Sequence, residues 1–249
     1  MKLYLCIISF VFQISNLESK IIPDYLPKLC SISTNNYDEC ATNTLKDWGP
    51  YLLNGIKEIN FPKMHPLHVP LVAVNRTLSA DLAMDAVLRD ALFYGFNGTQ
   101  FKYFKFDPQT KTGELSFNVP LLWATMEYEL AGRAYTLDLK GSGYCKGVTS
   151  DVEFLFQFKL KTVEKLGINY FTFEKFVGKS TIENGYAKLK SKDPAFQYAL
   201  DLIADIFNEN PRRLLDAFHP VYEEMVTYFF GLLGEQVLST IPAQEILPE

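Results

Sequence analysis

The chain has 249 residues, of which 48% are hydrophobic and 21% charged, so it has ample apolar side chains for a core and too many for a disordered chain. Its formal net charge of −5 excludes a general electrostatic attraction to nucleic acid or to anionic lipid surfaces. At the start, Lys2, the apolar residues 3–14 and the small and polar residues through Ser19 are typical of a secretory signal peptide. We therefore predict a signal peptide at residues 1–19, one secreted domain at residues 20–249, and no transmembrane segment.

Cysteines and sequons agree with secretion. Cys30 and Cys40 enclose a short segment rich in Ser, Thr and Asn, which favours a disulfide-closed loop. Asn75 and Asn97 each begin an Asn-X-Thr sequon and are candidate glycosylation sites on the surface. Cys145 then has no partner in the mature chain. A small buried hydrophobic residue is the favoured interpretation, and a reactive or intermolecular thiol is the alternative.

The middle of the chain reads as strands. A short helix is predicted at residues 45–56, with Gly55 as its stop, followed by a proline-rich extended connector. Residues 126–139 change the phase of their alternation near Gly132, which predicts a bulge, and the glycine-rich residues 141–147 predict a turn. The other predicted strands, most of them with period-two alternation, are residues 78–88, 101–106, 115–121, 152–160, 168–177 and 181–189.

Helices close the chain. Asp193-Pro194 and Asn210-Pro211 each combine a capping residue with a proline in the first turn. The last helix, within residues 208–241, is apolar on every side between Met225 and Leu233, which predicts burial on every side, and Pro220 predicts a kink. Strands first and helices last indicate an antiparallel α+β fold. We predict a sheet wrapped around this long helix, with an interior that could hold an apolar ligand.

Signatures of catalysis are missing from the sequence. His65 and His68 lie among prolines without a nearby cluster of Cys or carboxylates, so we predict no metal site. No G-x-S-x-G motif is present, and the glycine-rich segment lacks phosphate-loop spacing. We therefore expect no enzyme and no cofactor.

An apolar pocket is instead predicted from the large side chains of the strands and the last helix. For each of them, ordinary core packing is the alternative interpretation. Tyr128 and Tyr135 could also offer a hydroxyl to a ligand oxygen. The predicted ligand-binding residues are Met84, Phe117, Trp123, Met126, Tyr128, Tyr135, Phe154, Phe156, Phe158, Tyr222, Met225 and Phe229.

Several motifs together resemble one family. They are Leu26-Pro-Lys-Leu-Cys30 with Cys40, the run from Tyr51 to Pro62 followed by His65-Pro66-Leu67, Gly132-Arg133, Gly141-Ser-Gly143 and Asn208-Glu-Asn210. Together these motifs are similar to those of the insect takeout and haemolymph juvenile hormone binding protein family, on its takeout-like branch. The resemblance implies a tubular lipid-binding fold, in which a highly curved antiparallel sheet wraps around a long C-terminal helix. It also implies extracellular, non-covalent carriage of a hydrophobic small molecule, such as a terpenoid, a fatty acid or a similar lipid. Two alternatives stay open: an extracellular signalling or interaction glycoprotein without cargo, and a secreted lipid-ester hydrolase.

Overall fold

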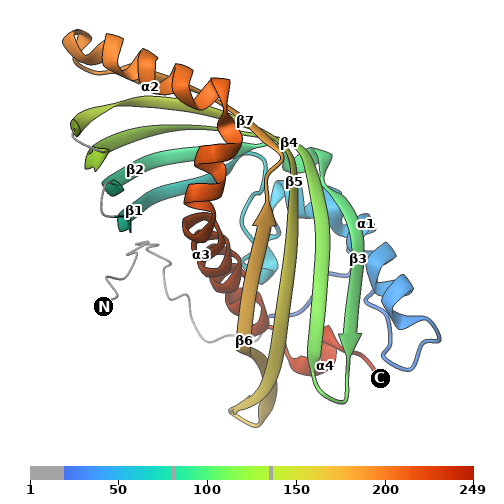
Figure 1. Cartoon of the computed structure of the whole chain (residues 1–249). Helices are drawn as coiled ribbons and strands as arrows, with labels where there is room; N and C mark the ends of the chain where they lie inside the picture. Colours follow the sequence, from blue (N-terminus) through green and yellow to red (C-terminus); the bar gives the residue numbers. More distant parts are fainter. Residues whose placement is uncertain (1–19, 80–81, 135–136) are drawn as a thin grey trace.

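The computed structural model describes residues 20–79, 82–134 and 137–249, so the predicted signal peptide lies outside the described residues. Figure 1 shows a strongly curled sheet with a long helix across its concave side. The elements are, in chain order, α1 (Tyr37–Asn54), η1 (Lys57–Ile59), β1 (Leu67–Ser79), β2 (Leu82–Tyr94), η2 (Phe96–Gly98), β3 (Gln100–Asp107), β4 (Thr112–Ala134), β5 (Leu137–Lys165), β6 (Ile168–Thr181), β7 (Asn184–Ser191), η3 (Pro194–Phe196), α2 (Gln197–Glu209), α3 (Pro211–Leu238) and α4 (Ala243–Ile246).

The sheet has seven strands, and each strand pair is antiparallel. Its central path runs β1-β2-β4-β5-β6, while β3 pairs with β4 and β7 pairs with β5. Two long strands pair with each other, all 23 residues of β4 facing residues 137–159 of the 29-residue β5, and both change their other neighbours from one end to the other. The predicted fold class, an α+β fold with a curled antiparallel sheet and a long C-terminal helix, is confirmed.

Alternation along the strands separates the two faces of the sheet. In β5, Val152, Phe154 and Phe156 are buried, whereas Glu153 and Gln157 are exposed. Successive strand residues point to opposite faces, so the aromatic residues gather on the concave side. There they form the main hydrophobic cluster with α3 residues such as Val221 and Leu233.

Two predicted strand features are wrong, for one physical reason. Residues 78–88 belong to two strands, because β1 ends at Ser79 and β2 begins at Leu82. The phase change in residues 126–139 is also a passage between strands: β4 ends at Ala134, β5 begins at Leu137, and Gly132 pairs regularly with Leu139 without a bulge. In both places two strands follow each other with only two residues between them, so the sequence reads as one strand, continuous in one case and shifted in phase in the other.

The glycine-rich residues 141–147 form part of β5 rather than the predicted turn. Here β5 pairs with β4 on one side and β7 on the other. A Cβ atom on Gly143 would lie 1.9 Å from the Lys190 carbonyl oxygen, while Gly141 and Gly147 have nothing within 4 Å of that position. Gly143 therefore permits a close backbone approach at the junction of three strands.

Helix α3 keeps 28 residues in one helix with Pro220 inside it. Leu215, Val221 and Leu233 are its buried residues, but Tyr228 is 40% exposed. The prediction of burial on every side is therefore wrong. The sheet covers one side of the helix, as Figure 1 shows, and does not close around it.

Helix α2 lies along the free edge of β7 and satisfies part of its backbone. The Asn208 amide accepts a hydrogen bond from the Ala187 N–H (2.8 Å) and donates one to the Ala187 carbonyl (2.9 Å). The Gln197 side-chain amide also bonds to the backbone of β7: it accepts a hydrogen bond from the Ser191 N–H (2.8 Å) and donates one to the Leu189 carbonyl (3.1 Å). These two side chains occupy the positions that another strand would take.

Helix α1 packs against β3. Phe104 N–H donates to Thr42 Oγ1 (2.8 Å), and Phe106 N–H donates to the Asp38 carboxylate (3.1 Å). The predicted disulfide is present between Cys30 and Cys40 and joins the preceding loop to the helix. The helix begins eight residues before the predicted start at 45 and ends at the predicted stop, Gly55, which has a φ of 80°.

Candidate functional site

A cavity of about 610 Å³ lies between the concave side of the sheet and the helices α1, α3 and α4. Its volume falls in the ~300–1,000 Å³ range of small-molecule sites. Strands β3 to β6 form one wall with a series of phenylalanines. The remaining walls come from Leu45, Trp48, Leu52 and Leu53 of α1, Phe230, Leu233 and Val237 of α3, and Ile246 with the adjoining Leu247 at α4.

Stacked and tilted rings hold the sheet wall in place. The Phe156 ring centroid lies 5.4 Å from that of Phe176 and 4.8 Å from that of Phe230, while Phe117 and Phe154 are 5.0 Å apart. Such offset and tilted pairs stabilise aromatic packing beyond the area they bury. The rings therefore connect strands β4, β5 and β6 to α3 and leave an apolar surface toward the cavity.

Trp48 shows how α1 contributes a polar atom without making the cavity polar. Its indole N–H donates to the Pro27 carbonyl (2.8 Å), so the donor is satisfied by the N-terminal segment. The side chain is buried and lines the cavity.

Three of the predicted ligand-binding residues, Phe117, Phe156 and Phe158, line this cavity. Four others, Met126, Phe154, Met225 and Phe229, belong to the main hydrophobic cluster without lining it. Tyr135 and the side chain of Met84 lie outside the described residues.

Tyr128, Tyr222 and Cys145 form a second, more polar group inside the fold. Tyr128 is 7% exposed, and its hydroxyl has no hydrogen-bond partner in the described part of the chain. Burial raises the pKa of both tyrosines, and the neighbouring Cys145 raises it further. Burial also raises the pKa of the Cys145 thiol, which keeps the thiol protonated and weakens it as a nucleophile.

Trp123 is not in the interior group. Its ring stacks on Tyr94 at 3.9 Å, and the Lys146 ammonium lies 5.3 Å from its centroid. Val119 is fully buried, whereas Leu121, two residues later, is exposed, and Leu122 packs on the core. The inward phase of β4 therefore changes between the Val119–Val152 and Leu121–Ser150 pairs, where Asp151 has a φ of 49°.

Sequence reasoning missed much of the cavity wall. Phe173 and Phe176 both line it although they are three residues apart in β6, because the pairing of β5 with β6 shifts at Lys159–Leu160. Leu45, Trp48, Leu52 and Leu53 recur at three- and four-residue steps, and that spacing was the available signal for α1.

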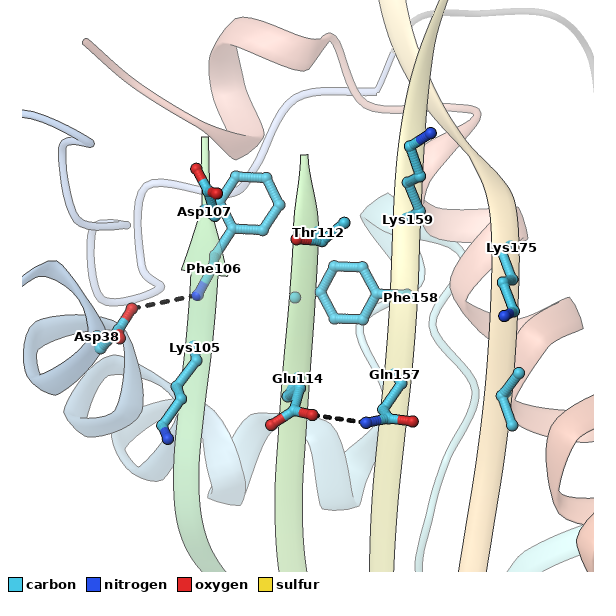
Figure 2. A pocket seen from close by; sticks show the side chains of 12 residues that line it. Asp38, Lys105, Phe106, Asp107, Thr112, Glu114, Gln157, Phe158, Lys159 and Lys175 are labelled. Carbon is cyan, nitrogen blue, oxygen red and sulfur yellow. Dashed lines mark hydrogen bonds between the residues drawn. The ribbon is translucent and has the colours of Figure 1, made fainter. Parts of the chain in front are cut away.

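The convex face carries a different hollow, of about 570 Å³. Figure 2 shows Lys105, Glu114 and Gln157 side by side on β3, β4 and β5, with Glu114 hydrogen-bonded to Gln157. Three lysines and three carboxylates line this hollow. Phe106 and Phe158 line both hollows, on either side of Gly113, which pairs with each of them. Balanced charge and an open polar surface make it a poor match for an apolar ligand.

The described part of the chain offers neither a metal site nor a membrane-spanning helix. Within residues 20–79, 82–134 and 137–249, no group of three His, Cys, Asp or Glu side chains could hold a metal ion. His68 instead hydrogen-bonds Asp90 (3.2 Å). No helix in the described part of the chain is both long and apolar enough to cross a membrane.

A curled sheet, a long helix on its concave side and an apolar cavity between them define a class of proteins that enclose hydrophobic molecules. The sequence matches the family described as haemolymph juvenile hormone binding protein over residues 5–248, so the chain belongs to this family, as its motifs predicted. This family comprises binding proteins rather than enzymes.

One solved structure supports the fold. Takeout 1 from Epiphyas postvittana is similar with a TM-score of 0.69 and 19% identity, covering 85% of this chain and 96% of that one. A lipopolysaccharide binding protein gives a TM-score of 0.37 and 12% identity, covering 81% of this chain and 39% of the other. No curated protein sequence matches the chain.

Proposed function

We propose that the protein is a secreted carrier that binds a small hydrophobic molecule non-covalently in the cavity between the sheet, α1, α3 and α4. The cavity carries this proposal, because nearly all its lining side chains are apolar and its volume suits a small molecule. Family membership supports the same general role. A terpenoid, a fatty acid or a similar lipid fits the chemistry of the walls.

The predicted ligand-binding residues divide into two parts of the proposed site. Phe117, Phe156 and Phe158 contact the apolar body of the cargo in the cavity. Tyr128, beside Tyr222, offers a hydroxyl to a polar group of a longer cargo. The unpartnered hydroxyl supports this role, because a buried donor without a partner costs about 1–3 kcal/mol.

Native mass spectrometry of the protein secreted from insect cells tests the proposal, together with solvent extraction of what it carries. We expect a discrete additional mass that is released on denaturation and extracts as a lipid. An empty protein that takes up neither fatty acids nor terpenoids would refute carriage and favour an extracellular interaction glycoprotein without cargo.

A further inference from the structure

The mouth of the cavity lies between α1 and η2. Three of the lining residues are exposed, namely Lys46 and Pro50 of α1 and Asn97 of η2. The other lining residues are buried or half-buried. The cavity is therefore most open to solvent beside these three side chains, where α1 and η2 contact each other.

The η2 turn places two neighbouring lining side chains at different depths in the cavity wall. Phe96 is 7% exposed and lines the cavity, whereas Asn97 is exposed. The turn is held by a bond from the Gly98 N–H to the Gly95 carbonyl (2.9 Å) and one from Thr99 Oγ1 to the Phe96 carbonyl (2.6 Å). Asn97 is thus fixed at the rim.

Asn97 is also the first residue of the sequon Asn97-Gly98-Thr99. We propose that an N-linked glycan on Asn97 stands at the mouth of the cavity and controls how fast cargo enters and leaves. This inference rests on the proposed carrier function. During secretion, the Asn97 amide nitrogen bonds to C1 of an oligosaccharide carried on a lipid pyrophosphate; the C1–O bond breaks, the lipid pyrophosphate leaves with the electron pair, and the amide loses a proton.

A glycan in this position acts on rates rather than on affinity. It is bulky and hydrophilic, so it hinders passage of an apolar molecule through the mouth. It does not contact cargo among the phenylalanines, so it leaves the bound state almost unchanged. Entry and exit should slow by the same factor, whereas loss of a direct contact changes mainly the dissociation rate.

Asn75 provides a matched control within the chain. It begins the other sequon, Asn75-Arg76-Thr77, and is exposed on β1. It does not line the cavity. A glycan there has the same chemistry as one on Asn97 and lies away from the mouth.

The experiment compares wild type, Asn97→Gln and Asn75→Gln, all secreted from insect cells. Peptide mass spectrometry after enzymatic deglycosylation first establishes whether each asparagine carries a glycan. Stopped-flow mixing with a fluorescent fatty acid then gives association and dissociation rates. We expect Asn97→Gln to raise both rates several-fold with little change in Kd, and Asn75→Gln to behave as wild type. An unmodified Asn97 in wild type, or equal rates in the three proteins, would overturn the inference.

A second measurement needs no cargo, so it separates failure of this inference from failure of the carrier function. Lys46 lies at the same mouth, and its acylation by a bulky activated ester can be followed by peptide mass spectrometry. We expect acylation several-fold faster in Asn97→Gln than in wild type or Asn75→Gln, with a small ester reacting equally in all three. Equal acylation by the bulky ester would refute a glycan at the mouth, whether or not the protein binds the fatty acid.

Discussion

At the residue scale, the absence of a side chain decides how closely the strands approach. Gly143 and Gly147 lie in the same strand and look equivalent in the sequence. Only Gly143 faces a backbone atom, the Lys190 carbonyl oxygen, at a distance no Cβ could tolerate. Close approach of this kind depends on three strands meeting, so alternation within one strand could not predict it.

This difference predicts the outcome of two matched substitutions. Gly143→Ala should lower the free energy of unfolding by at least about 1–3 kcal/mol, because β5 and β7 must move apart to admit the methyl group. Gly147→Ala, with open space at its Cβ position, should stay within about 0.5 kcal/mol of wild type. Urea unfolding followed by fluorescence measures both, and similar losses in the two variants would contradict the close approach.

Tyr37 predicts a response to alkaline pH. Burial, with a smaller effect of Asp38, raises its pKa from 10.0 to about 12. Between pH 10 and about pH 12 the unfolded chain has lost the Tyr37 phenolic proton, whereas the folded chain keeps it. The free energy of unfolding therefore falls as pH rises through this range. Well below pH 10 both states keep the proton, so Tyr37 causes no pH dependence there. Tyr37→Phe should flatten that fall. Urea titrations on both sides of pH 10 test this, with the exposed Tyr198→Phe as control; equal pH slopes in wild type and Tyr37→Phe would rule it out.

At the element scale, α2 closes the edge of β7 with side chains rather than with a strand. The sequence predicted a helix starting at Asp193-Pro194; the Asp193 carboxylate accepts a hydrogen bond from the Ala195 N–H (3.0 Å) and caps the η3 turn, which leads directly into α2. It did not predict that Asn208 and Gln197 reach β7. Polar residues on an amphipathic helix are ordinarily solvated or paired along the helix, as Gln197 is with Asp201 (2.7 Å), and their bonds to β7 depend on where the sheet edge lies.

The contribution of this contact can be measured with Asn208→Ala. Removing the amide deprives Ala187 of two hydrogen bonds, so we expect a loss of about 1–3 kcal/mol in the free energy of unfolding. Amide hydrogen exchange should accelerate at Ala187 and its neighbours in β7. Asn210→Ala is the control, because that side chain makes no capping hydrogen bond to α3. Unchanged exchange at Ala187 would show that α2 is dispensable to the edge.

At the scale of the whole molecule, element order correctly predicted an antiparallel sheet followed by a long helix, and the family resemblance correctly implied that the sheet is strongly curved. Alternation also assigned Phe117, Phe154 and Phe156 to the interior. It placed Trp123 there by extending the same phase past Pro120, where the strands change phase. The walls contributed by α1 and α4 depend on how distant segments fold back, and no local pattern specifies that.

The cavity as a whole predicts the effect of filling it. Leu45 lines the cavity from α1 and is half-buried, so Leu45→Trp should occupy part of the space without breaking the core. We expect at least a tenfold loss of fatty-acid affinity, equivalent to about 1.4 kcal/mol, with little change in the melting temperature. Leu202→Trp on the exposed side of α2 is the matched control. Full affinity in Leu45→Trp would place the cargo elsewhere.

The position of α3 near the end of the chain has a consequence for biosynthesis. The last strand, β7, ends at Ser191, but the helix that packs on the concave side is complete only at Leu238. Synthesis proceeds at about 5–20 residues per second, so the finished sheet waits for seconds with its apolar side bare. During that interval the apolar side of the sheet lacks its helical partner, so we expect a chain truncated before α3 to aggregate.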